Sequence, residues 1–165
     1  MRLYATIMAL LSLSTGSLIR GVDDPATGPV TWHGTITLHS PSVPRPYCWT
    51  RKVTLDGSSA DTCVTWYPVQ DRHAEAATQQ WHRDLRDDEV ARVDTLVSRL
   101  DPSAAEPVRP GSCWIAVCLT SSLGQTVSLS TMPSTQNNTT ARQLYALLAG
   151  PEDLLLPAHS FVCPS

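Results

Sequence analysis

The segment Gly111–Ser130, GSCWIAVCLTSSLGQTVSLS, contains the clearest strand–turn–strand pattern in the chain. Its first half is apolar on both sides of an extended backbone, which is typical of a strand inside a sheet. Its second half, Thr126–Ser130, alternates hydroxyl and aliphatic side chains, and residues 121–124 supply a turn. Because side chains alternate along a strand, Cys113 and Cys118 point to opposite faces and cannot bond to each other. We therefore expect the rest of the fold to pack around this hairpin.

The N-terminus has the features of a secretory signal peptide. Arg2 provides a positive charge, an apolar run follows, and small residues close the segment at 14–17. The apolar run is too short to cross a bilayer, which takes about 20 residues. We expect an extracellular protein with a signal peptide over 1–17, a flexible leader over 18–29 and a single disulfide-stabilised domain over 30–165.

The remaining chain is weakly acidic. Without Arg2, the only charged residue before position 18, it carries 11 basic and 15 acidic residues, a net charge of −4. This balance argues against nucleic acid or an anionic membrane as the partner. No later segment is apolar enough to span a membrane. We expect a monomer that binds an extracellular protein or glycan.

All five cysteines lie after the predicted signal peptide. The secretory pathway lets cysteines pair, but an odd number leaves at least one without an intramolecular partner, and two bonds can be arranged in fifteen ways. We expect Cys63 and Cys163 to bond to the hairpin cysteines, Cys113 and Cys118, and Cys48 to remain free. A zinc site is disfavoured because the cysteines lack metal-ligand spacing.

Three segments of the N-terminal half have strand character. Residues 31–39 alternate, with His33 and His39 on the polar side, and a proline-rich loop leads into a second strand over 47–55. A short third strand covers 62–69. The two histidines share a face but are roughly 20 Å apart, so we interpret them as solvated rather than as ligands of one metal ion.

The period then changes to that of a helix. Ala74–Gln80 contains good helix formers, and Asp84–Leu100 places aliphatic side chains at three- and four-residue steps, which predicts an amphipathic helix that covers the sheet. Its acidic first turns match the helix dipole, so we interpret these acids as structural rather than as a calcium or catalytic site.

The C-terminal third contains a second predicted helix and two glycosylation sequons. Asn137 and Asn138 begin overlapping motifs, of which we expect one to be used, since adjacent glycans would crowd each other. A capping box at Thr140 opens a helix over 141–149. Residues 154–163 are expected to contain a last edge strand.

These elements predict an α+β fold in which two helices cover one face of an antiparallel sheet. From residue 61 the expected order is β-α-β-β-α-β, with an extra N-terminal β-hairpin before it. The amphipathic helix, the proline-containing linker, the Gly-Ser-Cys-Trp-Ile-Ala-Val-Cys segment and the second helix resemble small secreted cysteine-rich proteins of filamentous fungi. The resemblance covers residues 61–150 and implies an effector-like or killer-toxin-like α/β sandwich.

The sequence contains no recognisable catalytic motif. It lacks the G-x-S-x-G, H-E-x-x-H and glycine-rich phosphate-binding patterns, so we assign no catalytic, cofactor-binding or metal-ligating residue. We favour a secreted, non-enzymatic protein that binds an extracellular or host target. A secreted hydrolase assembled from distant residues is the alternative, and a structural wall or coat protein is a third. An enzyme would show clustered polar groups with shifted pKa, and a binding protein an exposed aromatic patch.

Overall fold

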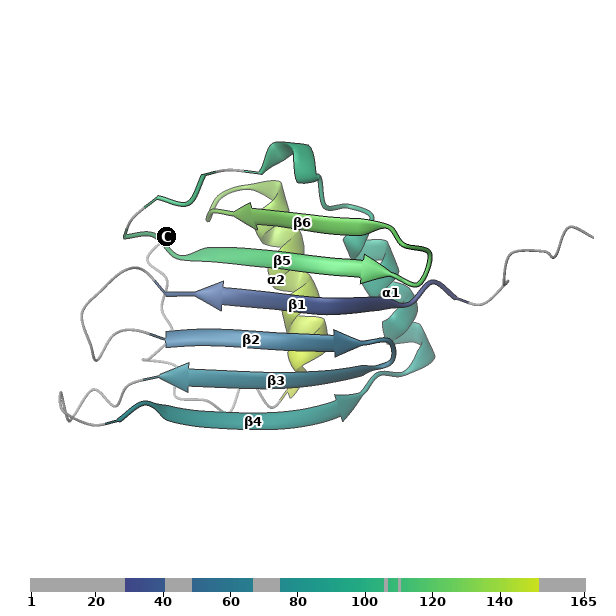
Figure 1. Cartoon of the computed structure of the whole chain (residues 1–165), viewed down its shortest axis with the longest axis horizontal. Helices are drawn as coiled ribbons and strands as arrows, with labels where there is room; N and C mark the ends of the chain where they lie inside the picture. Colours follow the sequence, from purple (N-terminus) through teal and green to yellow (C-terminus); the bar gives the residue numbers. More distant parts are fainter. Residues whose placement is uncertain (1–28, 41–48, 67–74, 106, 110, 152–165) are drawn as a thin grey trace, which may run out of the picture.

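The computed structural model describes residues 29–40, 49–66, 75–105, 107–109 and 111–151 (Figure 1). These residues form β1 (Trp32–His39), β2 (Trp49–Asp56), β3 (Ser59–Trp66), β4 (Ala77–Asp84), α1 (Asp87–Val97), the short 3-10 helix η1 (Pro102–Ala104), β5 (Trp114–Ser121), β6 (Thr126–Thr131) and α2 (Gln136–Ala149). The predicted signal peptide, most of the leader, Cys48, Cys163 and the last predicted strand lie outside them. Within the described ranges, no helix is long and apolar enough to cross a membrane.

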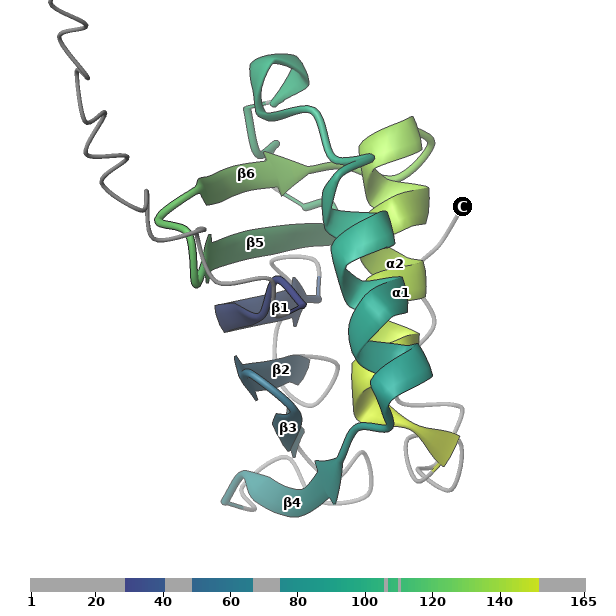
Figure 2. The ribbon, with the colours of Figure 1, turned by 90° about the vertical axis from the view of Figure 1, so that its right-hand side faces the viewer.

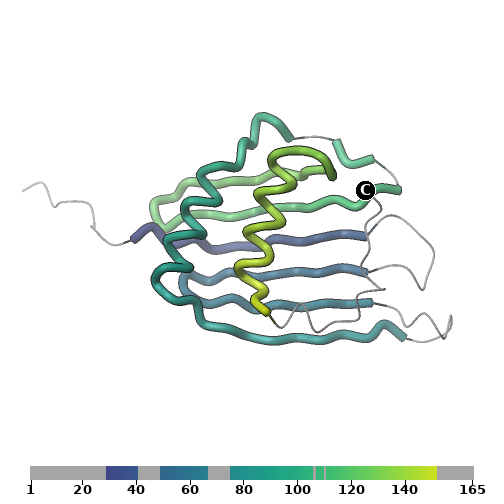
Figure 3. The backbone as a smooth tube through the Cα atoms, turned by 180° about the vertical axis from the view of Figure 1, so that it is seen from behind, coloured from purple at the N-terminus to yellow at the C-terminus, as the bar shows by residue number. Residues whose placement is uncertain are grey.

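All of these strands form one antiparallel sheet in the order β4-β3-β2-β1-β5-β6. Both helices pack on the same face of the sheet, as Figures 2 and 3 show. The predicted α+β class, with two helices on one face of an antiparallel sheet, is therefore confirmed. The predicted hairpin of β5 and β6 is also present, with Val117 opposite Leu129.

The N-terminal hairpin of β1 and β2 lies at the centre of the sheet. All eight residues of β1 have partners on β5, and its other edge pairs with β2. The predicted N-terminal hairpin is therefore present, but it is a central part of the sheet, because β1 joins the β5–β6 hairpin to the other strands. Gly34 permits the close approach of β1 and β5: its φ is +137°, and a Cβ there would collide with the carbonyl oxygen of Cys118.

Strand β4 replaces the helix that the sequence predicts over Ala74–Gln80. β4 pairs with β3 in eight consecutive residue pairs. These backbone hydrogen bonds outweigh a modest helical propensity, which is a weak guide where the tertiary structure offers a partner strand. Among the described residues the order from β3 onward is therefore β-β-α-β-β-α, where β-α-β-β-α-β was expected; the last strand of that expectation lies outside the described residues.

Helix α1 confirms the predicted amphipathic helix. Its buried residues are Glu89, Val90, Val93, Leu96 and Val97. The helix begins at Asp87, three residues later than predicted from Asp84. Its first turn is closed by the Glu89 side chain, which accepts a hydrogen bond from the Arg86 backbone N–H at 3.0 Å.

Helix α2 begins one turn earlier than predicted. Thr135 is its N-cap residue, and its hydroxyl accepts a hydrogen bond from the Asn138 backbone N–H at 3.0 Å. Thr140, the predicted cap, is instead a buried residue inside the helix. The helix ends where the sequence predicts, at Gly150, whose φ is +74°.

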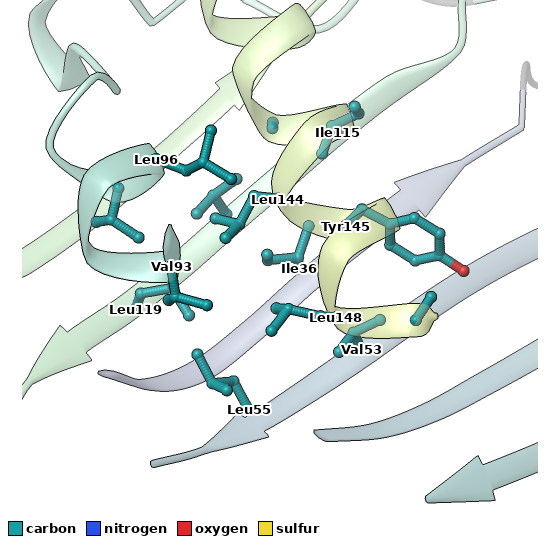
Figure 4. Close-up of a cluster of buried hydrophobic side chains, with 14 of the residues drawn as sticks. Ile36, Val53, Leu55, Val93, Leu96, Ile115, Leu119, Leu144, Tyr145 and Leu148 are labelled. Atoms are coloured by element: carbon teal, nitrogen blue, oxygen red, sulfur yellow. The ribbon is translucent and has the colours of Figure 1, made fainter. Parts of the chain in front are cut away.

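The core lies between the sheet and the two helices (Figure 4). Leu144 and Leu148 of α2 are completely buried, as are Ile36 of β1 and Val53 of β2. Burial of each such side chain contributes about 2 kcal/mol before entropy is subtracted. Both helices pack on the apolar face of the sheet, so the mostly polar side chains that alternate with the buried ones lie on the opposite face.

Two side chains of strand β4 form hydrogen bonds with the helices. The Trp81 indole N–H donates to the carbonyl of Ala149 at 2.8 Å. The Arg83 guanidinium donates to the carbonyl of Leu147 at 2.8 Å and to the Glu89 carboxylate at 2.6 Å. The two carbonyls belong to the last turn of α2, where helical N–H partners run out, so β4 satisfies the end of that helix.

Candidate functional site: the open face of the sheet

One face of the sheet is left without a covering helix in the described part of the chain. Figure 1 looks onto this face, and Figure 2 shows both helices on the opposite side. We call it the open face. Side chains alternate along each strand, so every second residue lies on this face. These residues are His33, Thr35, Thr37 and His39 of β1; Thr50, Lys52, Thr54 and Asp56 of β2; Ser59, Asp61, Cys63 and Thr65 of β3; Thr78, Gln80, His82 and Asp84 of β4; Trp114, Ala116, Cys118 and Thr120 of β5; and Thr126, Ser128 and Ser130 of β6.

Two histidines on the open face are hydrogen-bonded to aspartates. His33 Nδ1 lies 2.7 Å from Asp56 Oδ1, and His82 Nδ1 lies 2.8 Å from Asp61 Oδ1. The other ring nitrogen of His82 lies 3.4 Å from Asp84 Oδ1. The hydrogen bond that the His82 ring donates to Asp61 raises the pKa of His82 above its ordinary value, because the carboxylate stabilises the imidazolium form, and Asp84 adds to the effect.

A shallow depression of about 430 Å³ lies beside the second of these pairs. It is lined by Lys52, Thr54, Asp61, Thr62, Cys63, Gln80, Trp81 and His82. The Gln80 side-chain amide donates to the Cys63 sulfur at 3.6 Å. The lining therefore combines an ammonium, a carboxylate, hydroxyls, an amide, a thiol, an indole and an imidazole, which suits a polar ligand.

The rings of His39 and Trp114 are stacked elsewhere on the open face. Their centroids are 3.9 Å apart and their planes differ by 11°. Partial burial lowers the pKa of His39, which favours the neutral imidazole. Trp114 lies on the open face, whereas the other four tryptophans belong to the hydrophobic core or pack against it. Each ring covers one side of the other, and Trp114 remains partly exposed.

The state of the cysteines differs from the predicted pairing. Cys113 is buried, and Cys63 and Cys118 are free thiols. This corrects the expectation that both take part in bridges. That expectation placed β3 beside the β5–β6 hairpin, whereas β1 and β2 lie between β3 and β5, about 14 Å of sheet. As predicted, Cys113 and Cys118 lie on opposite sides of the sheet; Cys48 and Cys163 are outside the described residues.

Both asparagines of the predicted sequons are buried and hydrogen-bonded. The Asn137 amide donates to the Asp101 carbonyl and accepts from the Asp101 N–H, each at 2.9 Å. The Asn138 amide donates to the Thr131 carbonyl at 3.4 Å and accepts from the Arg142 guanidinium at 2.8 Å. These asparagines are 5% and 3% exposed, respectively. A glycan on either side-chain nitrogen would displace these contacts, so the fold disfavours the predicted glycosylation.

The acids at the start of α1 have structural partners. The pKa of Glu89 is lowered, first by the hydrogen bond from the Arg86 backbone and then by the Arg83 guanidinium.

His33 and His39 share the open face, as predicted, but make separate contacts with Asp56 and Trp114. No group of three or more His, Cys, Asp or Glu side chains among the described residues is arranged to hold a metal ion.

The contribution of β4 to the open face was missed by reasoning from the sequence. The strand alternates Gln80, His82 and Asp84 on the open face with Trp81 and Arg83 on the helical face. This period of two is a strand signal. This strand signal was missed because the segment has few apolar residues to mark a buried side and because helix-forming residues over 74–80 come directly before it.

Comparison with known protein families, curated proteins and solved structures found no match to this chain.

Proposed function

We propose that this chain is a secreted, non-enzymatic, effector- or toxin-like protein that binds an extracellular glycan through the open face. The observation that carries the proposal is the open face itself, a six-stranded polar surface with one aromatic stack. Secretion rests on the charge, apolar run and small residues of positions 1–17. The resemblance to small secreted fungal proteins supports the same class.

The chemistry of the open face fits a polyhydroxylated ligand. Threonine and serine hydroxyls both donate and accept hydrogen bonds, as sugar hydroxyls do. The His39–Trp114 stack offers a flat surface on which a sugar ring can pack. Among the described residues the exposed large hydrophobic side chains are Val108 and Leu123, and both lie outside the strands. Among the described residues, Trp114 is therefore the one large apolar side chain of the open face, whereas most protein–protein interfaces are dominated by several such anchors.

A hydrolase is the second candidate, because Cys63 and His82 line the same depression. The Asp61–His82 pair also has the form of a general base with its orienting carboxylate. However, the free nitrogen of His82 is directed at Asp84, and the Cys63 sulfur accepts a hydrogen bond from Gln80. In the described structure no hydrogen bond joins the thiol to the imidazole, so this geometry favours binding over catalysis.

Secretion is tested by expressing the full chain and sequencing the N-terminus of protein recovered from the culture medium. The mature protein should begin near Leu18, since small residues precede that position. Recovery of the protein with Met1 intact, or only inside cells, would contradict this part of the proposal.

Binding is tested on a glycan array, followed by titration calorimetry with a retained ligand. Trp114→Ala should weaken binding roughly three- to tenfold, because it removes the aromatic surface. Leu123→Ala is the matched control, since Leu123 is exposed in the turn after β5. An array without a retained glycan, or equal affinity of Trp114→Ala and the wild type, would refute the proposal. Hydrolysis of an ester or peptide substrate that Cys63→Ser abolishes would favour the hydrolase instead.

A further inference from the structure

Lys52 is the ammonium group of the open face, and it has no carboxylate partner among the described residues. Lys52 is the only lysine of the chain and lies on β2, near the middle of the sheet. Each aspartate of the open face is contacted by a histidine, in the pairs described above. Lys52 is exposed, and no carboxylate of the described residues lies within ion-pairing distance of it. An anionic group would therefore find an available cation there.

Lys52 is surrounded by small side chains and by further hydrogen-bond donors. It lies opposite Thr37 on β1 and opposite Cys63 on β3, neither of which is long enough to cover it. Thr54 and Gln80 line the same depression and add a hydroxyl and an amide. The Asp61 carboxylate lines it too and is hydrogen-bonded to His82. Lys52, Thr54 and Gln80 can together contact one carboxylate and the hydroxyls beside it.

The aromatic stack lies within reach of a ligand bound at Lys52. Thr37 is opposite Lys52, and His39, two residues further along β1, is opposite Trp114. Two strand spacings and two residues of rise therefore separate Lys52 from Trp114, about 12 Å between Cα atoms. A short oligosaccharide can span this distance, whereas a single sugar cannot contact both groups.

We propose that the open face selects an acidic oligosaccharide, whose carboxylate pairs with the Lys52 ammonium while another ring packs against Trp114. This inference rests on the proposed function and names the ligand class of the same surface. Thr54 and Gln80 hydrogen-bond to hydroxyls of the ring that carries the carboxylate. The binding is non-covalent, and it weakens as salt screens the exposed ion pair.

The test compares two ligands that differ only in charge. A linear trisaccharide of uronic acid and its methyl ester, which is neutral and has the same ring skeleton, are titrated into the mature protein by calorimetry. Lys52→Met should weaken binding of the acid roughly three- to tenfold and leave the ester unaffected. Lys52→Arg should retain most of the affinity. Thr95→Ala, on the exposed side of α1, is the control and should bind both ligands as the wild type does.

The outcomes separate this inference from the proposed function. The inference would be overturned if the wild type bound the acid and the ester equally well, or if Lys52→Met bound the acid as tightly as the wild type does. If Trp114→Ala still weakens binding in that case, the proposed function stands. Failure of the wild type to bind either ligand while another glycan is retained would also overturn the inference alone. Binding of an oligoglutamate peptide as tightly as the acid, with the same dependence on Lys52, would overturn the assignment to a saccharide.

Discussion

Replacing Glu89 with alanine should lower the free energy of unfolding by about 2–4 kcal/mol. The Glu89 carboxylate is 2.6 Å from the Arg83 guanidinium and accepts from the Arg86 backbone N–H at 3.0 Å. Loss of one partner from a buried ion pair costs about 3–5 kcal/mol, and loss of a helix cap about 1 kcal/mol. The lower range is expected because Arg83 keeps its hydrogen bond to the Leu147 carbonyl and its side chain is 19% exposed.

Urea unfolding at pH 7, followed by tryptophan fluorescence, measures this change. Asp88→Ala is the matched control: Asp88 lies in the same helical turn, but its ion pair with Arg86 is exposed and is worth less than about 1 kcal/mol. Glu89→Gln separates the two contributions, because an amide oxygen can still accept from the Arg86 N–H but carries no charge. Equal unfolding midpoints for Glu89→Ala and Asp88→Ala would refute the argument.

The stabilisation by Glu89 should also depend on pH. The pKa of this carboxyl is lowered in the folded protein, first by the Arg86 backbone hydrogen bond and then by Arg83. A lowered pKa in the folded state means that the stabilisation is complete above the ordinary glutamate pKa of about 4.3 and is lost as the pH falls through the folded value. The difference in unfolding free energy between wild type and Glu89→Ala should therefore stay constant from pH 7 to about pH 5 and shrink below that.

Leu96→Ala should lower the free energy of unfolding by about 2–5 kcal/mol, because Leu96 lies on the core-facing side of α1 and is only 6% exposed. Thr95→Ala, on the exposed side of the same helix, should change the free energy of unfolding far less. Equal urea midpoints for the two variants would show that the core-facing side of α1 is misassigned. The imidazole of His82 should titrate in an NMR experiment above the ordinary histidine pKa of about 6.5, because Asp61 stabilises its protonated form. The contribution of this pair to stability is therefore full below about pH 6.5 and is lost as the pH rises through the pKa of the folded protein. Asp61→Asn should lower the pKa of His82, and an unchanged titration would contradict the pairing. Gly34→Ala should prevent proper pairing of β1 with β5, since its Cβ would collide with a carbonyl oxygen of β5 at a positive φ. Circular dichroism and thermal unfolding would detect this, and a wild-type melting temperature would disprove it.

Local periodicity in the sequence is sufficient for much of the fold. The alternating pattern of residues 111–130 predicts the β5–β6 hairpin, and the three- and four-residue spacing after Asp84 predicts α1. These patterns are readable because each reflects contact between one side of an element and the core, which depends on the element's own residues. The predicted solvent exposure of His33 also follows from strand alternation alone, and the structure shows it on the open face.

The order of the strands was decided by the tertiary structure. Which edge of β1 pairs with β5 depends on contacts between residues about 80 positions apart, and no local pattern reports them. The same holds for β4, whose helix formers become a strand because β3 presents a free edge. The separation of Cys63 from Cys118 and the assembly of Lys52 and Trp114 on one face both follow from that strand order. The sequence by itself determined the period of most elements and the polar sides of β1 and β6, but only the long-range pairing of strands decided which side chains of the open face are neighbours.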